Sequence, residues 1–178
     1  DEDLAASLVD YEQRNRAHLD PWGPPAPAGF FSVEGQRQRL QQSEQAEAAG
    51  TGRAFWLVLK DKPERIVGHA RLSQIARGPF CSAMLGYSLD ADCEGQGLMH
   101  EALRAVIDMT FSGDAPLHRI QANVRTENTR SSRLLQRLGF AQEGFAPQYL
   151  FIAGAWRDHL MFALRNTAWP ADRAPPVN

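Results

Sequence analysis

The chain has 178 residues, of which 43% are hydrophobic and 22% are charged, values typical of a globular protein with a hydrophobic core. Its formal net charge of −2 disfavours nonspecific nucleic-acid binding, which depends on a basic surface. No apolar run approaches the roughly 20 residues of a membrane helix, and the acidic N-terminus lacks the basic start of a signal peptide. Cys81 and Cys93 have no metal-like spacing. We therefore expect reduced thiols in a cytoplasmic protein, with neither membrane nor direct nucleic-acid binding.

The N-terminal part of the chain predicts two helices separated by a proline-rich loop. Apolar residues recur at helical spacing over residues 4–19, and this helix has to end before Pro21. The segment PWGPPAPAG (21–29) is a loop. Residues 32–49 are rich in Gln and Glu, which indicates an exposed helix that stops at Gly50.

The rest of the chain predicts mainly strands, with hairpin turns at Lys62–Pro63 and at Ala153–Gly154. In chain order, the expected elements are strands at 54–61, 65–75 and 81–90, a helix at 99–111, a strand at 118–125, a helix at 128–138, and strands at 144–152 and 156–164. This order predicts an α+β fold with a mixed sheet. We expect a single domain over residues 1–178, with a loose tail at 170–178.

The stretch DCEGQGLMHEALRAV (92–106) places Gly95 and Gly97 between a predicted strand and a predicted helix. The first backbone N–H groups of a helix lack internal partners and carry the positive end of the helix dipole, so an anion fits there. Glycines allow positive φ angles and a close approach of the ligand, so a phosphate can bind here without a lysine. The chain has no GxxxxGK[ST] run, which excludes a P-loop, and His100 replaces the third glycine of a Rossmann fingerprint.

Two segments, in this order, resemble the GNAT acetyltransferase superfamily. Residues 94–99 are similar to its pyrophosphate loop, (Arg/Gln)-x-x-Gly-x-(Gly/Ala), although Glu94 stands in the Arg/Gln place and Met99 in the Gly/Ala place. The segment NTRSSRLLQRLGF (128–140) resembles the N-x-x-S-x-x-L-x-x-x-G-F segment of the RimJ/RimL-like ribosomal-protein alanine N-acetyltransferases. The resemblance extends to Trp169. Such proteins usually begin with a strand ahead of the first helix, and we expect that strand to be absent from this chain.

The resemblance implies a GNAT fold, in which a central mixed, mostly antiparallel sheet is splayed in the middle and flanked by helices. It also implies acetyl-CoA as cosubstrate and no metal. Backbone N–H groups at 95–99 would bind the pyrophosphate, and the open edge of the strand at 85–89 would pair with pantetheine and hold the oxyanion. A carboxylate at Glu94 would repel the pyrophosphate unless it faces solvent or is offset by Arg130 or Arg133. The expected coenzyme contacts are Leu85, Gly86, Tyr87, Ser88, Leu89, Glu94, Gly95, Gln96, Gly97, Leu98, Met99, Asn123, Asn128, Ser131 and Leu135.

The resemblance assigns Ser131 the protonation of the leaving thiolate, with an ordinary exposed helix serine as the alternative. The attacking amine has to be neutral. An α-amine has a reference pKa of about 7.7–8.0, against about 10.4 for lysine, so roughly a tenth of α-amines are already neutral at pH 7. A water relay could therefore suffice. Glu143 and Asp158 are the main candidate bases, followed by His159 and Glu34.

The acceptor groove is expected between the first helices and the last hairpin, with Trp22, Tyr87 and Tyr149 as substrate contacts. Other aromatic residues that could line it are Phe30, Phe31, Phe151 and Trp156, with core packing as the alternative. The histidines show no metal-like spacing, so no metal site is expected.

These features predict an acetyl-CoA-dependent N-acetyltransferase that acts on the N-terminal alanine or serine of a ribosomal or other protein, by direct attack in a ternary complex. Two alternatives remain open. One is a GNAT enzyme that acetylates a small amine, an amino acid or an antibiotic. The other is a non-catalytic coenzyme A-binding module, which the carboxylate at Glu94 keeps open. The chain is expected to be a monomer or a homodimer.

Overall fold

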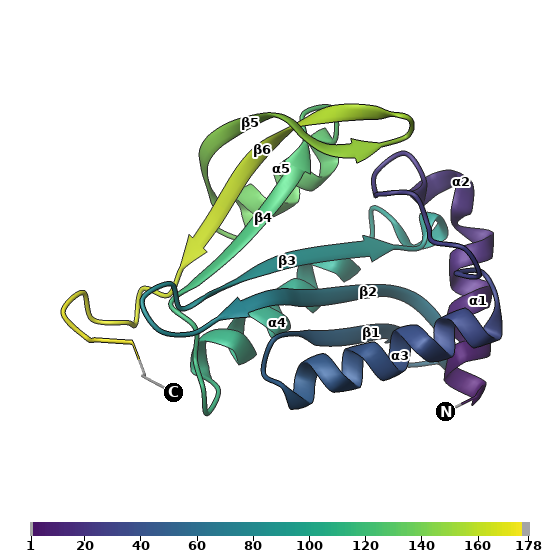
Figure 1. Cartoon of the computed structure of the whole chain (residues 1–178), viewed down its shortest axis with the longest axis horizontal. Helices are drawn as coiled ribbons and strands as arrows, with labels where there is room; N and C mark the ends of the chain where they lie inside the picture. The colour runs from purple at the N-terminus through teal and green to yellow at the C-terminus, as the bar shows by residue number, and fades with distance from the viewer. Residues whose placement is uncertain (1, 176–178) are drawn as a thin grey trace.

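The computed structural model describes residues 2–175, which form a six-stranded sheet flanked by helices (Figure 1). The helices are α1 (Glu2–Arg14), α2 (Arg16–Leu19), α3 (Val33–Ala48), α4 (Leu98–Ser112) and α5 (Thr129–Arg137), with a 3₁₀ turn, η1, at Ala91–Cys93. The strands are β1 (Arg53–Leu59), β2 (Lys62–Ala76), β3 (Ser82–Leu89), β4 (Arg119–Arg125), β5 (Ala141–Ile152) and β6 (Ala155–Arg165). No helix within residues 2–175 combines the length and the apolar character that crossing a membrane requires.

The strands lie in the order β1-β2-β3-β4-β6-β5, and all neighbours are antiparallel except β3 and β4. Along the described chain, the parallel pairing of β3 with β4 covers just Ser82 to Met84. Past Met84 the two strands diverge into a V, as Figure 1 shows. The edge of β3 that faces β4 is therefore open over residues 85–89. This confirms the predicted mixed sheet that splays in the middle.

Helices cover both faces of this sheet. In Figure 1, α1 and α3 lie on one face, and α4 and α5 lie on the other. The α1–α3 side has its own small cluster, in which Leu8 and Tyr11 pack against Leu40 and Ile66. On the first face, α1 packs against β2 and α3 packs against β1.

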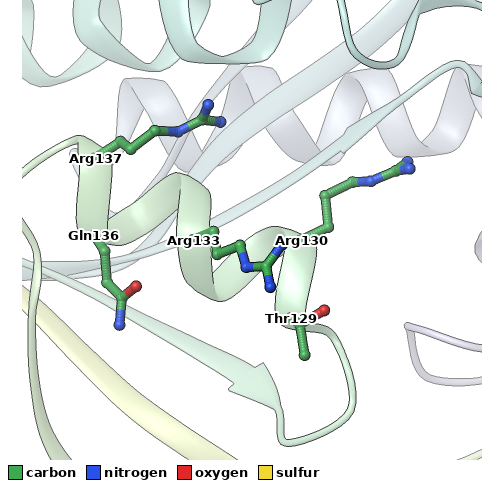
Figure 2. Close-up of a pocket in the computed structure, with 5 residues that line it drawn as sticks. All are labelled: Thr129, Arg130, Arg133, Gln136 and Arg137. Carbon is green, nitrogen blue, oxygen red and sulfur yellow. The ribbon is translucent and has the colours of Figure 1, made fainter.

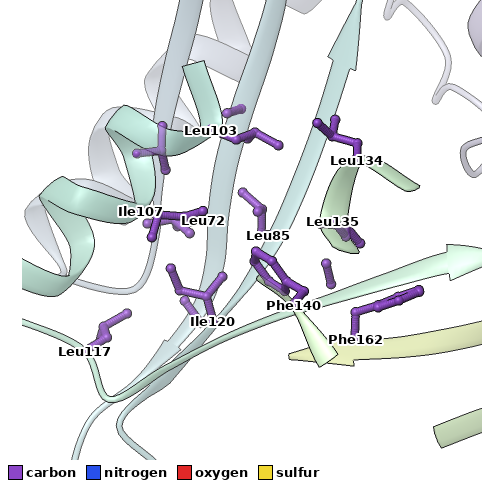
Figure 3. Close-up of a cluster of buried hydrophobic side chains, with 14 of the residues drawn as sticks. Leu72, Leu85, Leu103, Ile107, Leu117, Ile120, Leu134, Leu135, Phe140 and Phe162 are labelled. Atoms are coloured by element: carbon purple, nitrogen blue, oxygen red, sulfur yellow. The ribbon is translucent and has the colours of Figure 1, made fainter. Parts of the chain in front are cut away.

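The larger core lies between the sheet and the α4–α5 layer (Figure 3). Leu103 of α4, Ile120 of β4 and Leu135 of α5 have no exposed surface. Burial of one such side chain contributes about 1.5–3 kcal/mol. This core fixes the start of α4 and the first turn of α5 relative to the open edge of β3.

The predicted helix over residues 4–19 is broken at Asn15. The Asn15 amide nitrogen donates to the Tyr11 carbonyl at 3.0 Å, and its side-chain oxygen accepts from the Ala91 amide at 3.0 Å. Asparagine side chains compete with helical backbone hydrogen bonds, which explains the break. The same side chain ties the end of α1 to the segment ahead of α4.

Two further details differ from the sequence prediction. The first hairpin turns at Lys60–Asp61, two residues before the predicted position, and Lys62 already pairs with Leu59. Proline is tolerated near the first residue of a strand, so Pro63 does not mark the turn itself. The hairpin at Ala153–Gly154 is confirmed. Of the tail that was expected to be loose, residues 176–178 lie outside the described part of the chain.

Candidate active site

A cleft of about 1410 Å³ opens where β3 and β4 diverge. Its volume exceeds the roughly 300–1,000 Å³ of most small-molecule pockets, so it can hold two reactants. The main parts of its lining are residues 86–89 of β3, residues 94, 95 and 97–100 around the start of α4, residues 69, 71 and 73 of β2, the outer side of α5, and the loop Asp20–Phe31, which we call the acceptor loop. Gly86, Tyr87, Ser88, Leu89, Glu94, Gly95, Gly97, Leu98, Met99, Asn128 and Ser131 from the predicted coenzyme set all line it.

The glycine turn before α4 has the geometry of an anion site. Gly95 has φ 75° and Gly97 has φ 81°, values in the left-handed region where side chains are strained. Gly97 caps α4 without any side-chain hydrogen bond. A Cβ atom on either glycine would meet no atom within 4 Å, so both face open space. The amides of the first helical turn are therefore free of side-chain caps and accessible from the cleft.

Asp90 holds this turn in place from behind. Its carboxylate accepts hydrogen bonds from Arg14 at 2.9 Å, Arg65 at 3.2 Å and the Asp92 amide at 3.1 Å. Burial raises the pKa of Asp90, but these hydrogen bonds and the Arg14 charge outweigh it, so the pKa lies below its usual value. Asp90 therefore stays ionised and anchors the turn to α1 and β2.

The Glu94 carboxylate is already paired within the cleft. It forms an ion pair with Arg130 of α5, and its other oxygen lies 3.5 Å from Nε2 of His18 of α2. The Glu94 side chain is 25% exposed. Its negative charge is thus offset by Arg130, one of the two arginines that the sequence suggested for this purpose. The three residues also connect α2, the glycine turn and α5 around the mouth of the cleft.

The outer side of α5 carries a row of arginines (Figure 2). Arg130, Arg133 and Arg137 are spaced so that they share one face of the helix, while Leu134 and Leu135 pack into the core. Arg133 and Arg137 form no ion pair with any residue in the described range 2–175. Arg137, which lines the cleft, and Arg133, on the neighbouring surface of α5, are therefore free to bind anionic groups.

Two hydroxyl groups meet at the open end of β3. Tyr87 Oη and Ser131 Oγ lie 2.6 Å apart, within hydrogen-bonding distance. Burial raises the pKa of Tyr87 to about 12, although the hydrogen bond with Ser131 lowers it in part. Tyr87 therefore keeps its proton at neutral pH, and the pair can donate one hydrogen bond into the cleft.

Asn128 positions Ser131 from the start of α5. Its side-chain oxygen accepts from the Ser131 amide at 3.0 Å, which is the predicted N-cap. The side-chain amide nitrogen of Asn128, Nδ2, has no hydrogen-bond partner within residues 2–175, whereas its backbone N–H donates to the Arg125 carbonyl at 2.9 Å. The cap and a hydrogen bond to a ligand carbonyl can therefore coexist.

The sequence prediction missed a polar strip on the acceptor side of the cleft. His69, Arg71 and Ser73 alternate along β2 and line the cleft, while Ala70 and Leu72 face the core. Burial, with the Arg39 and Arg71 charges, lowers the pKa of His69 to about 3. His69 is therefore neutral at physiological pH and can accept a hydrogen bond. Polar alternation on a central strand was the signal that could have identified this strip.

The structure does not bring every predicted site residue to the cleft. Glu143 forms an ion pair with Arg119, and the hydrogen bond from Arg119 holds the pKa of Glu143 below its usual value. Asp158 accepts from the Gln148 amide at 2.8 Å. Neither carboxylate lines the cleft, because both lie on the β5–β6 hairpin and engage partners near it.

Other predicted residues also lie away from the cleft lining. Leu135 is fully buried in the core, since it is on the inner side of α5. Asn123 donates to Tyr149 Oη at 2.8 Å, which pairs these two on β4 and β5 outside the lining. The His159 ring lies 5.3 Å from the ring of Tyr149. Trp22 and Tyr87 do line the cleft, whereas Glu34 pairs with Arg37 on the exposed side of α3.

A family model described as an acetyltransferase (GNAT) domain matches residues 1–141. The chain belongs to the GNAT acetyltransferase family. It is 40% identical to the [Ribosomal protein uS5]-alanine N-acetyltransferase of Escherichia coli (strain K12) over 167 residues, which are 93% of this chain and 84% of the relative.

Two solved structures are similar over nearly the whole chain. The ribosomal-protein-S5-alanine acetyltransferase from Vibrio fischeri has a TM-score of 0.89 at 38% identity, covering 95% of this chain and 91% of that chain. RimJ of Mycobacterium smegmatis, solved in complex with a CoA disulfide, has a TM-score of 0.87 at 29% identity, covering 98% of this chain and 82% of that chain. As a GNAT protein, this chain is an acyltransferase, and its splayed sheet is the family's fold.

Proposed function

We propose that this chain transfers the acetyl group of acetyl-CoA to the N-terminal amine of a ribosomal or other protein that begins with alanine or serine. The observation that carries the proposal is the cleft itself. It combines a free helix start at Gly97, a hydroxyl pair at Tyr87 and Ser131, and an open strand edge in one continuous space. The relative from Escherichia coli (strain K12), named for acetylation of the alanine of uS5, supports the acceptor class.

In this proposal, the coenzyme supplies the acetyl thioester and lies along the open edge of β3. The amides of residues 95–99 and the free arginines of α5 hold its phosphates. Asn128 donates a side-chain Nδ2–H to the pantetheine arm. The backbone amides on the open edge of β3 accept the negative charge that develops on the acetyl oxygen.

The acceptor attacks through its neutral amine, which is roughly a tenth of the α-amine population at pH 7. The carboxylates that line the cleft are each paired with an arginine: Glu12 with Arg39 at 2.6 Å, Asp20 with Arg16 at 3.5 Å, and Glu94 with Arg130. Each of these carboxylates thus already contacts a guanidinium group. Proton transfer from an α-ammonium with a pKa of about 8 to His69, whose pKa is about 3, would be uphill by about 7 kcal/mol. The attacking nitrogen therefore loses its proton to water once the C–N bond has formed.

The leaving sulfur is stabilised by the hydroxyl pair. Ser131 and Tyr87 share one hydrogen bond, which leaves the second hydroxyl hydrogen free to donate to the sulfur as the C–S bond breaks. The sulfur receives its proton through water from the ammonium that forms on the acceptor.

We also propose a cytoplasmic location, because Cys81 and Cys93 are both buried free thiols.

Turnover of acetyl-CoA against a matched panel tests this proposal. The panel holds peptides that begin with Ala, Ser, Leu or acetylated Ala, together with spermidine, free amino acids and an aminoglycoside. We expect high kcat/KM with the Ala and Ser peptides and none with the acetylated peptide. Activity confined to free small amines, or coenzyme binding without any transfer, would contradict the proposal.

A further inference from the structure

The acceptor loop, Asp20–Phe31, lines one side of the cleft, and its hydrogen bonds and charged contacts with other elements lie near its two ends. Its first end is set by the Trp22 amide, which donates to the Leu19 carbonyl at 2.9 Å. Its second end is set by Gln36, which donates to the Phe30 carbonyl at 2.6 Å. Proline fixes φ at several positions and stiffens the loop, but stiffness alone does not determine where the wall stands.

Arg125 reaches this loop from the opposite side of the V. It is the last residue of β4, and its guanidinium donates to the Pro21 carbonyl. The same guanidinium lies 5.4 Å from the centre of the Trp22 ring, as a cation–π contact. Within residues 2–175, no other side chain of β4, β5 or β6 hydrogen-bonds to the acceptor loop. Arg125 therefore bridges the two halves of the divided sheet.

The surroundings of Arg125 fix its geometry. Its side chain is 10% exposed, and Glu127 accepts from a second guanidinium nitrogen at 3.2 Å. Its Nε atom is buried and has no hydrogen-bond partner within the described part of the chain. Leaving a buried N–H unpaired is unfavourable for folding. The stability of the fold alone does not account for an Arg125 side chain with an unpaired, buried Nε atom. A role of Arg125 in orienting the acceptor loop does account for it.

We propose that Arg125 is a positioning residue that holds Trp22 and the acceptor loop in place as the wall against which the acceptor's N-terminus binds. The inference rests on the proposed function, because it concerns the acceptor side of the same cleft. A planar guanidinium can donate to Pro21, pair with Glu127 and stack on Trp22 at once, whereas a lysine ammonium cannot do all three. Preorganisation of the wall lowers the cost of binding an acceptor.

The test uses the full chain with Arg125→Gln, Arg125→Lys and a matched control, Arg53→Gln. Arg53 is the first residue of β1, pairs with Glu47 at 3.1 Å and lies 5.4 Å from the ring of Phe55, but it does not line the cleft. We expect Arg125→Gln to raise KM for an Ala-starting peptide about tenfold, which corresponds to about 1.4 kcal/mol. Turnover at saturation and the Kd of coenzyme A should stay unchanged. Arg125→Lys should give an intermediate KM, and Arg53→Gln the wild-type value.

Hydrogen exchange provides a second measurement that does not require activity. Arg125→Gln should speed exchange in residues 22–31 while leaving α4 and α5 unchanged. An unchanged KM, or exchange in this loop at the wild-type rate, would overturn the inference. A parallel loss of coenzyme affinity with faster exchange throughout would also overturn it, since that result marks a purely structural role. If the wild type acetylates no peptide, the proposed function fails, and the exchange comparison still decides whether Arg125 holds the loop.

Discussion

Removal of either hydroxyl of the Tyr87–Ser131 pair should slow acetyl transfer by a limited and predictable factor. Burial raises the pKa of Tyr87 to about 12, whereas a thiol has a reference pKa of about 8.5. Full proton transfer from tyrosine to the leaving thiolate would thus be uphill by about 5 kcal/mol. The pair can therefore act by donating a hydrogen bond, and a hydrogen bond to a charged group contributes about 1.5–3 kcal/mol.

This range corresponds to a decrease of about 10- to 150-fold in kcat for Tyr87→Phe or Ser131→Ala. The assay is release of coenzyme A thiol with an Ala-starting peptide, together with the Kd of coenzyme A for each variant. Since the two hydroxyls are hydrogen-bonded, the double variant should be no slower than the slower single variant. Ser132→Ala is the matched control, because Ser132 Oγ donates to the Asn128 carbonyl within the same helix turn. Wild-type kcat in both single variants, with unchanged coenzyme affinity, would refute the reasoning.

Three further predictions concern charges in the cleft. Glu94→Gln should tighten coenzyme A binding several-fold at low salt, because it releases Arg130 to bind the phosphates. Calorimetry measures this affinity, and weaker binding would mean that Glu94 is needed to hold Arg130 in place. Double replacement Arg133→Gln/Arg137→Gln should raise KM for acetyl-CoA more than KM for acetyl-dephospho-CoA, and equal effects would show that neither guanidinium contacts the 3′-phosphate. The pKa of His69 is lowered from 6.5 to about 3 in the folded protein. As the pH falls below 6.5, His69 therefore binds a proton in the unfolded chain but not in the folded one, and the free energy of unfolding decreases. Between pH 7 and pH 5 this amounts to about 2 kcal/mol, and denaturant unfolding of His69→Asn should lack that part of the pH dependence.

The sequence predicted those features that depend on local spacing. The glycine turn at 95–97 followed from two glycines placed ahead of a helical pattern, and both have positive φ. The N-cap at Asn128 followed from one residue type at a helix start, and its side chain accepts the expected hydrogen bond. The divergence of β3 and β4 came from the family resemblance, since no pattern in either strand reports where the pairing stops.

Contacts between distant segments could not be predicted in this way. Tyr87 and Ser131 are 44 residues apart, and their pairing depends on how α5 packs across the open end of β3. The partners of Glu94 lie on α2 and α5, so a carboxylate that looked unfavourable in a local pattern is offset by the fold. Glu143 and Asp158 were chosen for their chemistry and their position on the last strands, but the hairpin engages both in other contacts.

Localisation of the acetyl group within one peptide tests the central claim most directly. A peptide that begins with alanine and contains an internal lysine offers an α-amine and an ε-amine to the same cleft. The protein is incubated with this peptide and acetyl-CoA at pH 7, and tandem mass spectrometry identifies the modified nitrogen. The account predicts acetylation of the α-amine alone, with none when that amine is already blocked. Acetylation of the lysine side chain, or an unmodified peptide despite coenzyme A binding, would contradict it.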